Sequence, residues 1–198
     1  MNSLGKEQLE AALKLLGELI AARGHPHQHF VVCGGSSLLV MGLVTRATTK
    51  DVDVLARFEN ERLEQAKPLP DWLQGAADDV QEQLGLPKNW FNTGPADDSF
   101  FRLGFPEGLE SRLTPRRYGE FLTISFISRY DQVFFKLYAT ADQGPGRHFL
   151  DLKELSPTQD ELIAAARWTR TQDPSEGFKL VLSELLGELG HEDVSSQI

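Results

Sequence analysis

The sequence predicts an α/β (α+β) fold, in which a small, mixed, twisted sheet is packed by helices and followed by a helical C-terminal part. Three observations carry this prediction. A short apolar strand at 30–33 runs directly into Gly34-Gly35 and a second apolar segment. Strands are also expected at 51–55 and at 121–127, where side chains alternate in character. Apolar residues at helical spacing dominate the chain from Tyr130 onward.

Length and composition bound the organisation of the chain. Its 198 residues suit one ordinary domain with a small appendage, and we expect a domain at 1–155 with a helical extension at 156–198 packed on it. Hydrophobic residues make up 40% and charged residues 25%, which allows a buried core. The net charge of -9 argues against a protein that coats nucleic acid by bulk charge, although a local basic patch remains compatible with it.

The remaining composition points to an intracellular protein without disulfides. Cys33 is the single cysteine, so there is no internal disulfide and no CxxC pair for zinc or redox chemistry. No apolar run is long enough to span a bilayer, and the N-terminus carries acids and lacks a cleavage signal. We therefore expect a cytoplasmic location and no membrane association.

The N-terminal helix is expected from Ser3 to Arg23, where apolar residues recur at helical spacing, with Ser3 as its cap and a glycine at its end. Such an amphipathic helix packs against a core. Three histidines at alternate positions follow between His25 and His29. Their spacing admits a metal site on a strand, but Pro26 and the polar neighbours favour a solvated connection.

The middle of the chain is expected to alternate short strands and helices. Two serines open a short buried helix at 38–44. In the strand at 51–55, two acids share one face and two valines the other. Residues 59–84 are expected to be helical in pieces interrupted by two prolines, and residues 85–119 to form loops and short strands.

The last third of the chain is expected to be mainly helical. The strand at 121–127 is predicted to be half-buried, and helices are predicted at 130–141 and 147–155. Two further helices finish the chain. The last is expected to have Asp173 as its cap and Pro174 at its first position.

Two short segments carry the chemistry, GGSS at 34–37 and DVD at 51–53. Aspartates at positions i and i+2 of a strand point to the same side, roughly 6.5–7 Å apart at Cα, so Asp51 and Asp53 can converge on one Mg²⁺. A Gly-Gly turn at a strand end lets backbone N–H groups approach a phosphate, and Ser36 adds a hydroxyl at a helix start. These parts favour binding of a nucleoside triphosphate and transfer of its α-phosphorus group. The sequence contains no GxxxxGK[ST] or GxGxxG alternative.

The same segments resemble the signature of the polymerase-β nucleotidyltransferase superfamily, GGSS followed by DVDV. The string RATTKDVDVL resembles the AbiEii-like branch, which includes nucleotidyltransferases of type IV toxin–antitoxin pairs. LGLPKNWFN, FFKLYA and RHFLDLKEL are similar to three later segments of that branch. The resemblance therefore extends from Val31 to about Leu155.

The resemblance implies a Mg²⁺-dependent enzyme that moves a nucleoside monophosphate from an NTP to a hydroxyl acceptor. It assigns the β- and γ-phosphates to Gly34, Gly35 and Ser36, and Mg²⁺ to Asp51 and Asp53. Lys136 is assigned to a phosphate of the nucleotide, and Asp151 completes the polar end of the site. On an amphipathic helix Lys136 can lay its stem on the core and extend its ammonium group toward the DVDV strand, although a surface lysine is the more ordinary interpretation of such a residue.

Two departures from the family pattern leave an alternative open. Many members of the superfamily carry a third carboxylate on a later strand, where this chain has Thr123 and Ser125, and Glu120 at the start of that strand is a weak substitute. His148 stands where the closing segment of the branch has its first Asp. Either the chain works with two carboxylates aided by Asp151, or it is a catalytically impaired nucleotide-binding or interaction module.

The resemblance also implies partners, namely an NTP, an RNA 3′ end or tRNA as acceptor, and a cognate antitoxin protein. The acidic charge favours a local RNA contact, or a protein or small-molecule acceptor, over a broad nucleic-acid groove. Arg112, Arg116 and Arg117 form a cluster that is a candidate for such a contact, with solvated surface charge as the ordinary alternative.

Overall fold

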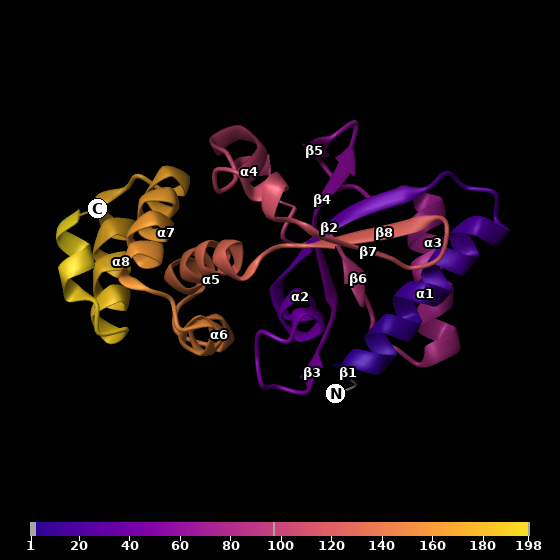
Figure 1. Cartoon of the computed structure of the whole chain (residues 1–198), viewed down its shortest axis with the longest axis horizontal. Coiled ribbons are helices and arrows are strands. Elements are labelled where there is room, and N and C mark those ends of the chain that lie inside the picture. Colours follow the sequence, from indigo (N-terminus) through magenta and orange to yellow (C-terminus); the bar gives the residue numbers. More distant parts are fainter. Residues whose placement is uncertain (1–2, 97, 198) are drawn as a thin grey trace.

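The protein has a mixed sheet at one end and a bundle of helices at the other (Figure 1). In the computed structural model, which describes residues 3–96 and 98–197, the sheet order is β5 (Arg62–Glu64), β4 (Val52–Glu59), β2 (Gln28–Cys33), β8 (Leu122–Phe126) and β7 (Thr114–Arg117). A sixth strand, β6 (Phe91–Asn92), runs parallel to β4. β2 and β8 are also parallel, and the pairs β5–β4, β4–β2 and β8–β7 are antiparallel. The predicted mixed α/β fold is confirmed.

Two helices cover one face of the sheet, α1 (Lys6–Ala22) and α3 (Asp71–Leu84). Alternate residues of β2, Phe30 and Val32, point into the core under these helices, as the period of a strand requires. The apolar spacing that predicted the first helix produces its buried face: Leu9, Ala12, Leu13, Leu16 and Ile20.

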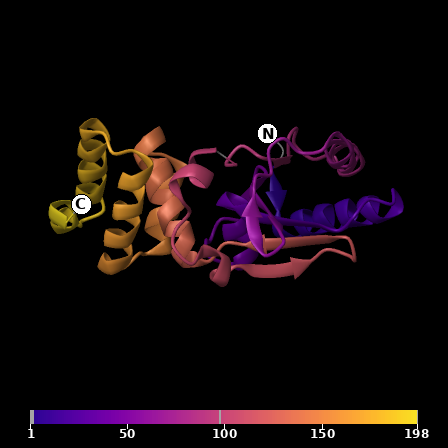
Figure 2. The same ribbon diagram turned by 90° about the horizontal axis from the view of Figure 1, so that it is seen from above.

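The opposite face of the sheet shares a second core with the helical part of the chain. This part consists of α5 (Arg129–Gln143), α6 (Arg147–Leu155), α7 (Gln159–Gln172) and α8 (Glu176–Glu188), which Figure 2 shows side by side beyond the end of the sheet. Because α5 packs against α6, α7 and α8, the helical region begins before the expected limit at residue 155. That limit between two domains stays a prediction.

Short helices and strands form the connections between the main elements. α2 (Gly34–Met41) follows β2 without a linker. β1 (Leu4–Gly5) pairs with β3 (Thr48–Thr49) and fastens the loop after α2 to the N-terminal segment. The connection from β6 to β7 contains α4 (Asp98–Leu103) and a 3₁₀ turn at Leu109–Arg112, and a second 3₁₀ turn lies at Glu192–Gln197. No helix among the described residues is long and apolar enough to cross a membrane.

Several predicted boundaries were wrong. Ser3 does not cap the first helix, because β1 intervenes and Gly5 takes the N-cap position without a side-chain bond. The first part of 59–84 is the β4–β5 hairpin and an extended segment, and helix forms only from Asp71, where the prolines end. The last helix is capped by Ser175, whose Oγ accepts from the backbone N–H of Phe178 at 3.2 Å.

Other predictions differ from the structure in burial or extent. The helix expected at 38–44 begins at Gly34 and ends at Met41, since Gly42 adopts a left-handed conformation. Strand β8 was expected to be half-buried but is buried on both faces: α1 packs on one face, and on the other Thr123 and Ser125 bind the side chains of His27 and His29 from the neighbouring segment. That segment is not wholly a solvated connection, since His29 belongs to β2.

Candidate active site

The two aspartates and the Gly-Gly turn meet because of the register of β2 and β4. Cys33 lies opposite Asp53 in this antiparallel pair, so the residue after Cys33, Gly34, lies against the Asp53 carboxylate. Gly34 has φ of +68°, and a Cβ there would lie 2.3 Å from Asp53 Oδ2. Only glycine fits this position, for both conformational and steric reasons. The start of α2 and the Asp53 carboxylate therefore lie in direct contact.

Burial raises the pKa values of both carboxylates. Burial and the neighbouring charge of Asp51 raise the pKa of Asp53 from 3.8 to about 6. Burial also raises the pKa of Asp51. Two carboxylates held close together in a partly desolvated place are the donor set that suits a hard cation.

Asp51 and Asp53 are therefore the residues that would hold a divalent cation. The described residues hold no cluster of three or more His, Cys, Asp or Glu side chains suited to a metal ion. A cation at the aspartate pair would take protein carboxylates for some positions, with water or phosphate oxygens for the rest. This is the usual pattern for Mg²⁺ in phosphate chemistry.

Asn92 supports the Asp53 carboxylate from the other side. The parallel pair β4–β6 places Asn92 opposite Asp53, and its Nδ2 donates to Asp53 Oδ1 at 3.4 Å, which lowers the Asp53 pKa against the larger effect of burial. The Asn92 Oδ1 accepts from the backbone N–H of Gly94 at 2.8 Å and so fixes the amide.

Polar side chains of Arg46, Thr49 and Arg147 closely surround Gly35, in the first turn of α2, and we call the narrow space between them the recess over Gly35. A Cβ at Gly35 would lie 2.7 Å from Thr49 Oγ1, 3.0 Å from Arg46 Nη2 and 3.4 Å from Arg147 Nη2. The Nε and Nη2 atoms of Arg46 are buried and have no hydrogen-bond partner among the described residues. Because the N-terminus of α2 adds its own positive potential, the recess suits an anion.

Ser36 lies next to this recess but its side chain turns away from it. The residue is fully buried, and its Oγ donates to the Cys33 carbonyl oxygen at 3.4 Å. Its contribution to an anion would come from the backbone N–H at the helix start. The hydroxyl contribution predicted for Ser36 is therefore not visible in this arrangement.

Lys136 and Asp151 form a buried ion pair beside the carboxylates. Lys136 Nζ lies 2.8 Å from Asp151 Oδ2 and donates to His148 Nδ1 at 3.3 Å, while the other oxygen of Asp151 pairs with Arg46. Lys136 is 3% exposed and Asp151 is 2% exposed, so Lys136 is not a surface lysine. Burial and the Lys136 charge lower the pKa of His148. The charge of Lys136 also lowers the pKa of Asp53, which places it within electrostatic reach of that carboxylate.

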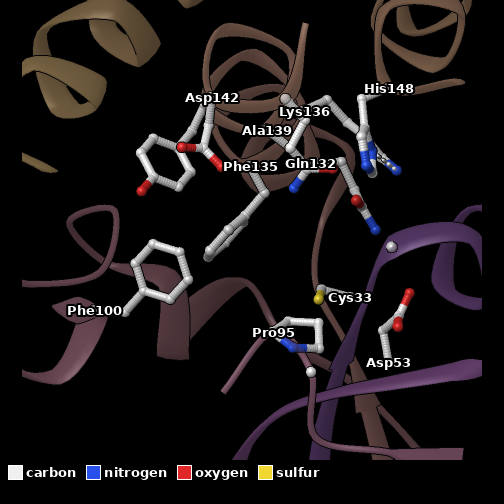
Figure 3. A pocket seen from close by; sticks show the side chains of 14 residues that line it. Cys33, Asp53, Pro95, Phe100, Gln132, Phe135, Lys136, Ala139, Asp142 and His148 are labelled. Carbon is white, nitrogen blue, oxygen red and sulfur yellow. Dashed lines mark hydrogen bonds between the residues drawn. The ribbon is translucent and has the colours of Figure 1, made fainter. Parts of the chain in front are cut away.

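A pocket of about 370 Å³ extends from Asp53 along one face of α5 (Figure 3). Asp53 and Gln132 lie at one end, and Phe135 and Phe100 lie toward the other. Pro95 faces the helix across the pocket. The pocket therefore leads from Asp53 to an end that is mainly aromatic, where Asp142 also lies, and a pocket that is part polar and part apolar suits an amphipathic ligand such as a nucleotide.

The positions where a third carboxylate was sought carry hydroxyls that bind histidines. His29 Nε2 lies 2.8 Å from Ser125 Oγ, and His27 Nε2 lies 2.9 Å from Thr123 Oγ1. Glu120 is exposed and precedes β8. His27 and His29 thus pair with residues of β8, His25 stacks on Trp72, and the three form no metal cluster among the described residues.

Two arginines of the cluster predicted from the sequence, Arg112 and Arg116, form ion pairs with acidic side chains. Arg112 binds the buried carboxylate of Asp131 through two nitrogens, at 2.6 and 3.1 Å to its two oxygens, and Arg116 pairs with Glu10 at 3.2 Å. Acids therefore neutralise two of the three arginines of the predicted cluster, while Arg117 is exposed.

A family model matches the part of the chain that carries most of this site. The model of a family described as nucleotidyltransferase of unknown function (DUF6036) matches residues 7–145. The chain belongs to this family. The matched region includes the DUF6036 chain's Gly-Gly turn, both aspartates and Lys136, and ends before Asp151. No curated protein and no solved structure matches the chain.

Sequence reasoning missed several residues that surround the site of this DUF6036 protein: Arg46, Thr49, Asn92, Gln132 and Arg147. Arg46 and Thr49 stand inside the RATTKDVDVL string, and Asn92 closes LGLPKNWFN, so their segments were recognised but their side chains were not. Gln132 precedes Lys136 by one helical turn, and that spacing was the available signal.

Proposed function

We propose that this protein is a Mg²⁺-dependent nucleotidyltransferase that moves a nucleoside monophosphate from an NTP to a hydroxyl acceptor. One observation carries the proposal. Gly34, whose φ is positive, brings the start of α2 against Asp53, so a phosphate on the helix N-terminus would lie beside a cation on the aspartates. Family membership supports the same chemistry.

The β- and γ-phosphates are assigned to the recess over Gly35. The unpartnered nitrogens of Arg46 and the guanidinium of Arg147 supply charge-assisted donors, and Thr49 supplies a hydroxyl. A nucleotide held there leaves its α-phosphorus near the aspartates and its base toward the aromatic end of the pocket. Lys136 neutralises part of the phosphate charge, and Asp151 positions both Lys136 and Arg46 through their ion pairs.

Asp51 and Asp53 would hold Mg²⁺. When bound, the ion neutralises phosphate charge and lowers the barrier for an attacking hydroxyl. In the transfer, the acceptor oxygen forms a bond to the α-phosphorus, the bond to the β-phosphate oxygen breaks, pyrophosphate leaves, and the hydroxyl proton passes to water.

The acceptor is assigned to a second, open pocket of about 710 Å³ on the other side of the aspartates. Asp51 lines it, together with Lys67, Lys88 and Asn89. Two lysines suit a phosphate-bearing acceptor such as an RNA 3′ end or tRNA. By the resemblance of its motifs to the AbiEii-like branch, we assign the protein a cytoplasmic toxin role with a cognate antitoxin protein as partner.

Label transfer tests the proposal. Purified protein is incubated with Mg²⁺, each of the four [α-³²P]NTPs in turn, and total RNA or cell protein. We expect label in one of these acceptors and release of unlabelled pyrophosphate. The Asp51→Asn, Asp53→Asn double variant is the control, and equal labelling by it would overturn the assignment of the aspartates.

The runner-up function is a catalytically impaired nucleotide-binding module. The observation in its favour is the pairing of Ser125 and Thr123 with histidines, where other superfamily members have a third carboxylate. This candidate predicts NTP binding in calorimetry together with no label transfer to any acceptor.

A further inference from the structure

Gln132 is a buried side chain whose hydrogen bonds the fold leaves unmade. It lies in the first turn of α5 and is fully buried. Neither its Oε1 nor its Nε2 has a hydrogen-bond partner in the part of the chain that the structure describes. Its backbone is satisfied, since the N–H donates to the Ser128 carbonyl oxygen at 2.9 Å. The unused capacity is therefore in the side-chain amide alone.

A buried amide without hydrogen-bond partners destabilises the folded protein, but it can form hydrogen bonds with a bound ligand. A buried polar group without a partner loses its bonds to water, and native proteins carry few such groups. Gln132 lines the pocket that starts at Asp53, and Figure 3 shows its amide pointing into the space above Cys33 and Asp53. A bound ligand can supply both missing partners.

The position of Gln132 along the pocket limits which part of a nucleotide it meets. The anion recess over Gly35 is formed by Arg46 and Arg147, which do not line this pocket. The aromatic end, with Phe135 and Phe100, lies farther along α5 than Gln132. A nucleotide is linear in its chemistry, with phosphates, sugar and base in that order. The group between the phosphate end and the aromatic end is the sugar.

We propose that Gln132 binds the ribose hydroxyls of the NTP and makes the site selective for ribonucleotides. The amide has a donor and an acceptor, and each sugar hydroxyl both donates and accepts, so the two groups complement each other. This inference rests on the proposed function, because it takes the orientation of the nucleotide from the phosphate recess. It assigns to Gln132 a role in specificity that the motifs of the sequence did not indicate.

The test is equilibrium binding, measured by calorimetry in Mg²⁺ with an NTP, its 2′-deoxy analogue and its 3′-deoxy analogue. The wild-type protein should bind the NTP about tenfold more tightly than at least one of the deoxy analogues, the size expected for one buried hydrogen bond. Gln132→Met keeps the length of the side chain and removes the amide. It should bind all three ligands with equal affinity, while the melting temperature stays the same or rises because an unpaired buried amide is gone.

Two further variants keep the test decisive. Gln143→Met changes a glutamine at the other end of α5 that also lines the pocket, and it should preserve the wild-type preference. Gln132→Asn keeps an amide but shortens the side chain, so it should also lose the preference for the NTP over its deoxy analogues. It replaces the Met variant in the test if that variant does not fold. The proposal is overturned if either Gln132 variant keeps the wild-type preference, or if affinity for all three ligands falls by one common factor. Failure of the wild-type protein to bind any NTP would instead overturn the proposed function.

Discussion

Replacing Asp53 by Asn should make the protein more stable while it removes transfer. In the folded protein, burial and Asp51 raise the pKa of Asp53 from 3.8 to about 6. At about 1.4 kcal/mol per pKa unit, the charged carboxylate costs the fold up to about 3 kcal/mol at neutral pH. Because Asp53 is partly exposed and water relaxes around it, we expect about 1–2 kcal/mol of this in practice.

The stability gain should follow pH in a defined direction. A carboxyl whose pKa is raised on folding binds more protons in the folded state than in the unfolded state, so its charge destabilises the fold as the pH rises. The gap between the Asn variant and the wild type should therefore be absent below about pH 4, grow between pH 4 and 6, and stay constant above that range. The Asn side-chain oxygen can still accept from Asn92, so that hydrogen bond is kept.

Thermal unfolding in EDTA measures the effect. For a chain of this size, each kcal/mol corresponds to about 2–4 °C, so the melting temperature should rise by about 2–8 °C at pH 7.5. Added Mg²⁺ should then stabilise the wild type but not the variant. A lower melting temperature for Asp53→Asn at pH 7.5, or a gap that does not change with pH, would refute this account of the carboxylate.

Three further changes test other parts of the site. Lys136→Ala should cut the transfer rate by about two to three orders of magnitude. It should also lower the free energy of unfolding in urea by about 3 kcal/mol, because it leaves the buried Asp151 with one partner fewer. Unchanged stability would contradict the ion pair. Gly35→Ala should abolish NTP binding in calorimetry, since its Cβ would stand where the anion lies; Gly75→Ala is the control, because a Cβ there meets nothing within 4 Å. Arg147→Gln should weaken NTP binding about tenfold but leave the binding of a nucleoside monophosphate unchanged, because the monophosphate lacks the β- and γ-phosphates that Arg147 is proposed to bind. An equal loss of affinity for both ligands would place the γ-phosphate elsewhere.

The sequence predicted the fold where local pattern decides the structure. Apolar spacing predicted the helices at 130–141 and 147–155, and the structure has them at Arg129–Gln143 and Arg147–Leu155. Alternating acids and valines predicted the strand that became β4. Boundaries failed where tertiary pairing outweighs local signals, as in β1, which takes the residues that Ser3 was expected to cap.

The candidate site could be predicted in its motifs but not in its partners. The spacing of Asp51 and Asp53 indicates a shared face, yet their closeness to Gly34 depends on the register of β2 and β4, which no local pattern fixes. The partners of Lys136 lie on α6, and the recess over Gly35 combines a loop residue with the first residue of that helix. Such contacts between distant segments arise only when the elements pack.

The most direct test of the site is a crystal structure of the protein with Mn²⁺ and a non-hydrolysable NTP analogue. We predict an anomalous peak bound by the Asp51 and Asp53 carboxylates, with the β- and γ-phosphates over Gly35. The base should lie at the aromatic end of the pocket, near Phe135. A metal bound away from these aspartates, or a triphosphate that lies outside the Gly35 recess, would contradict the proposed nucleotidyltransferase site.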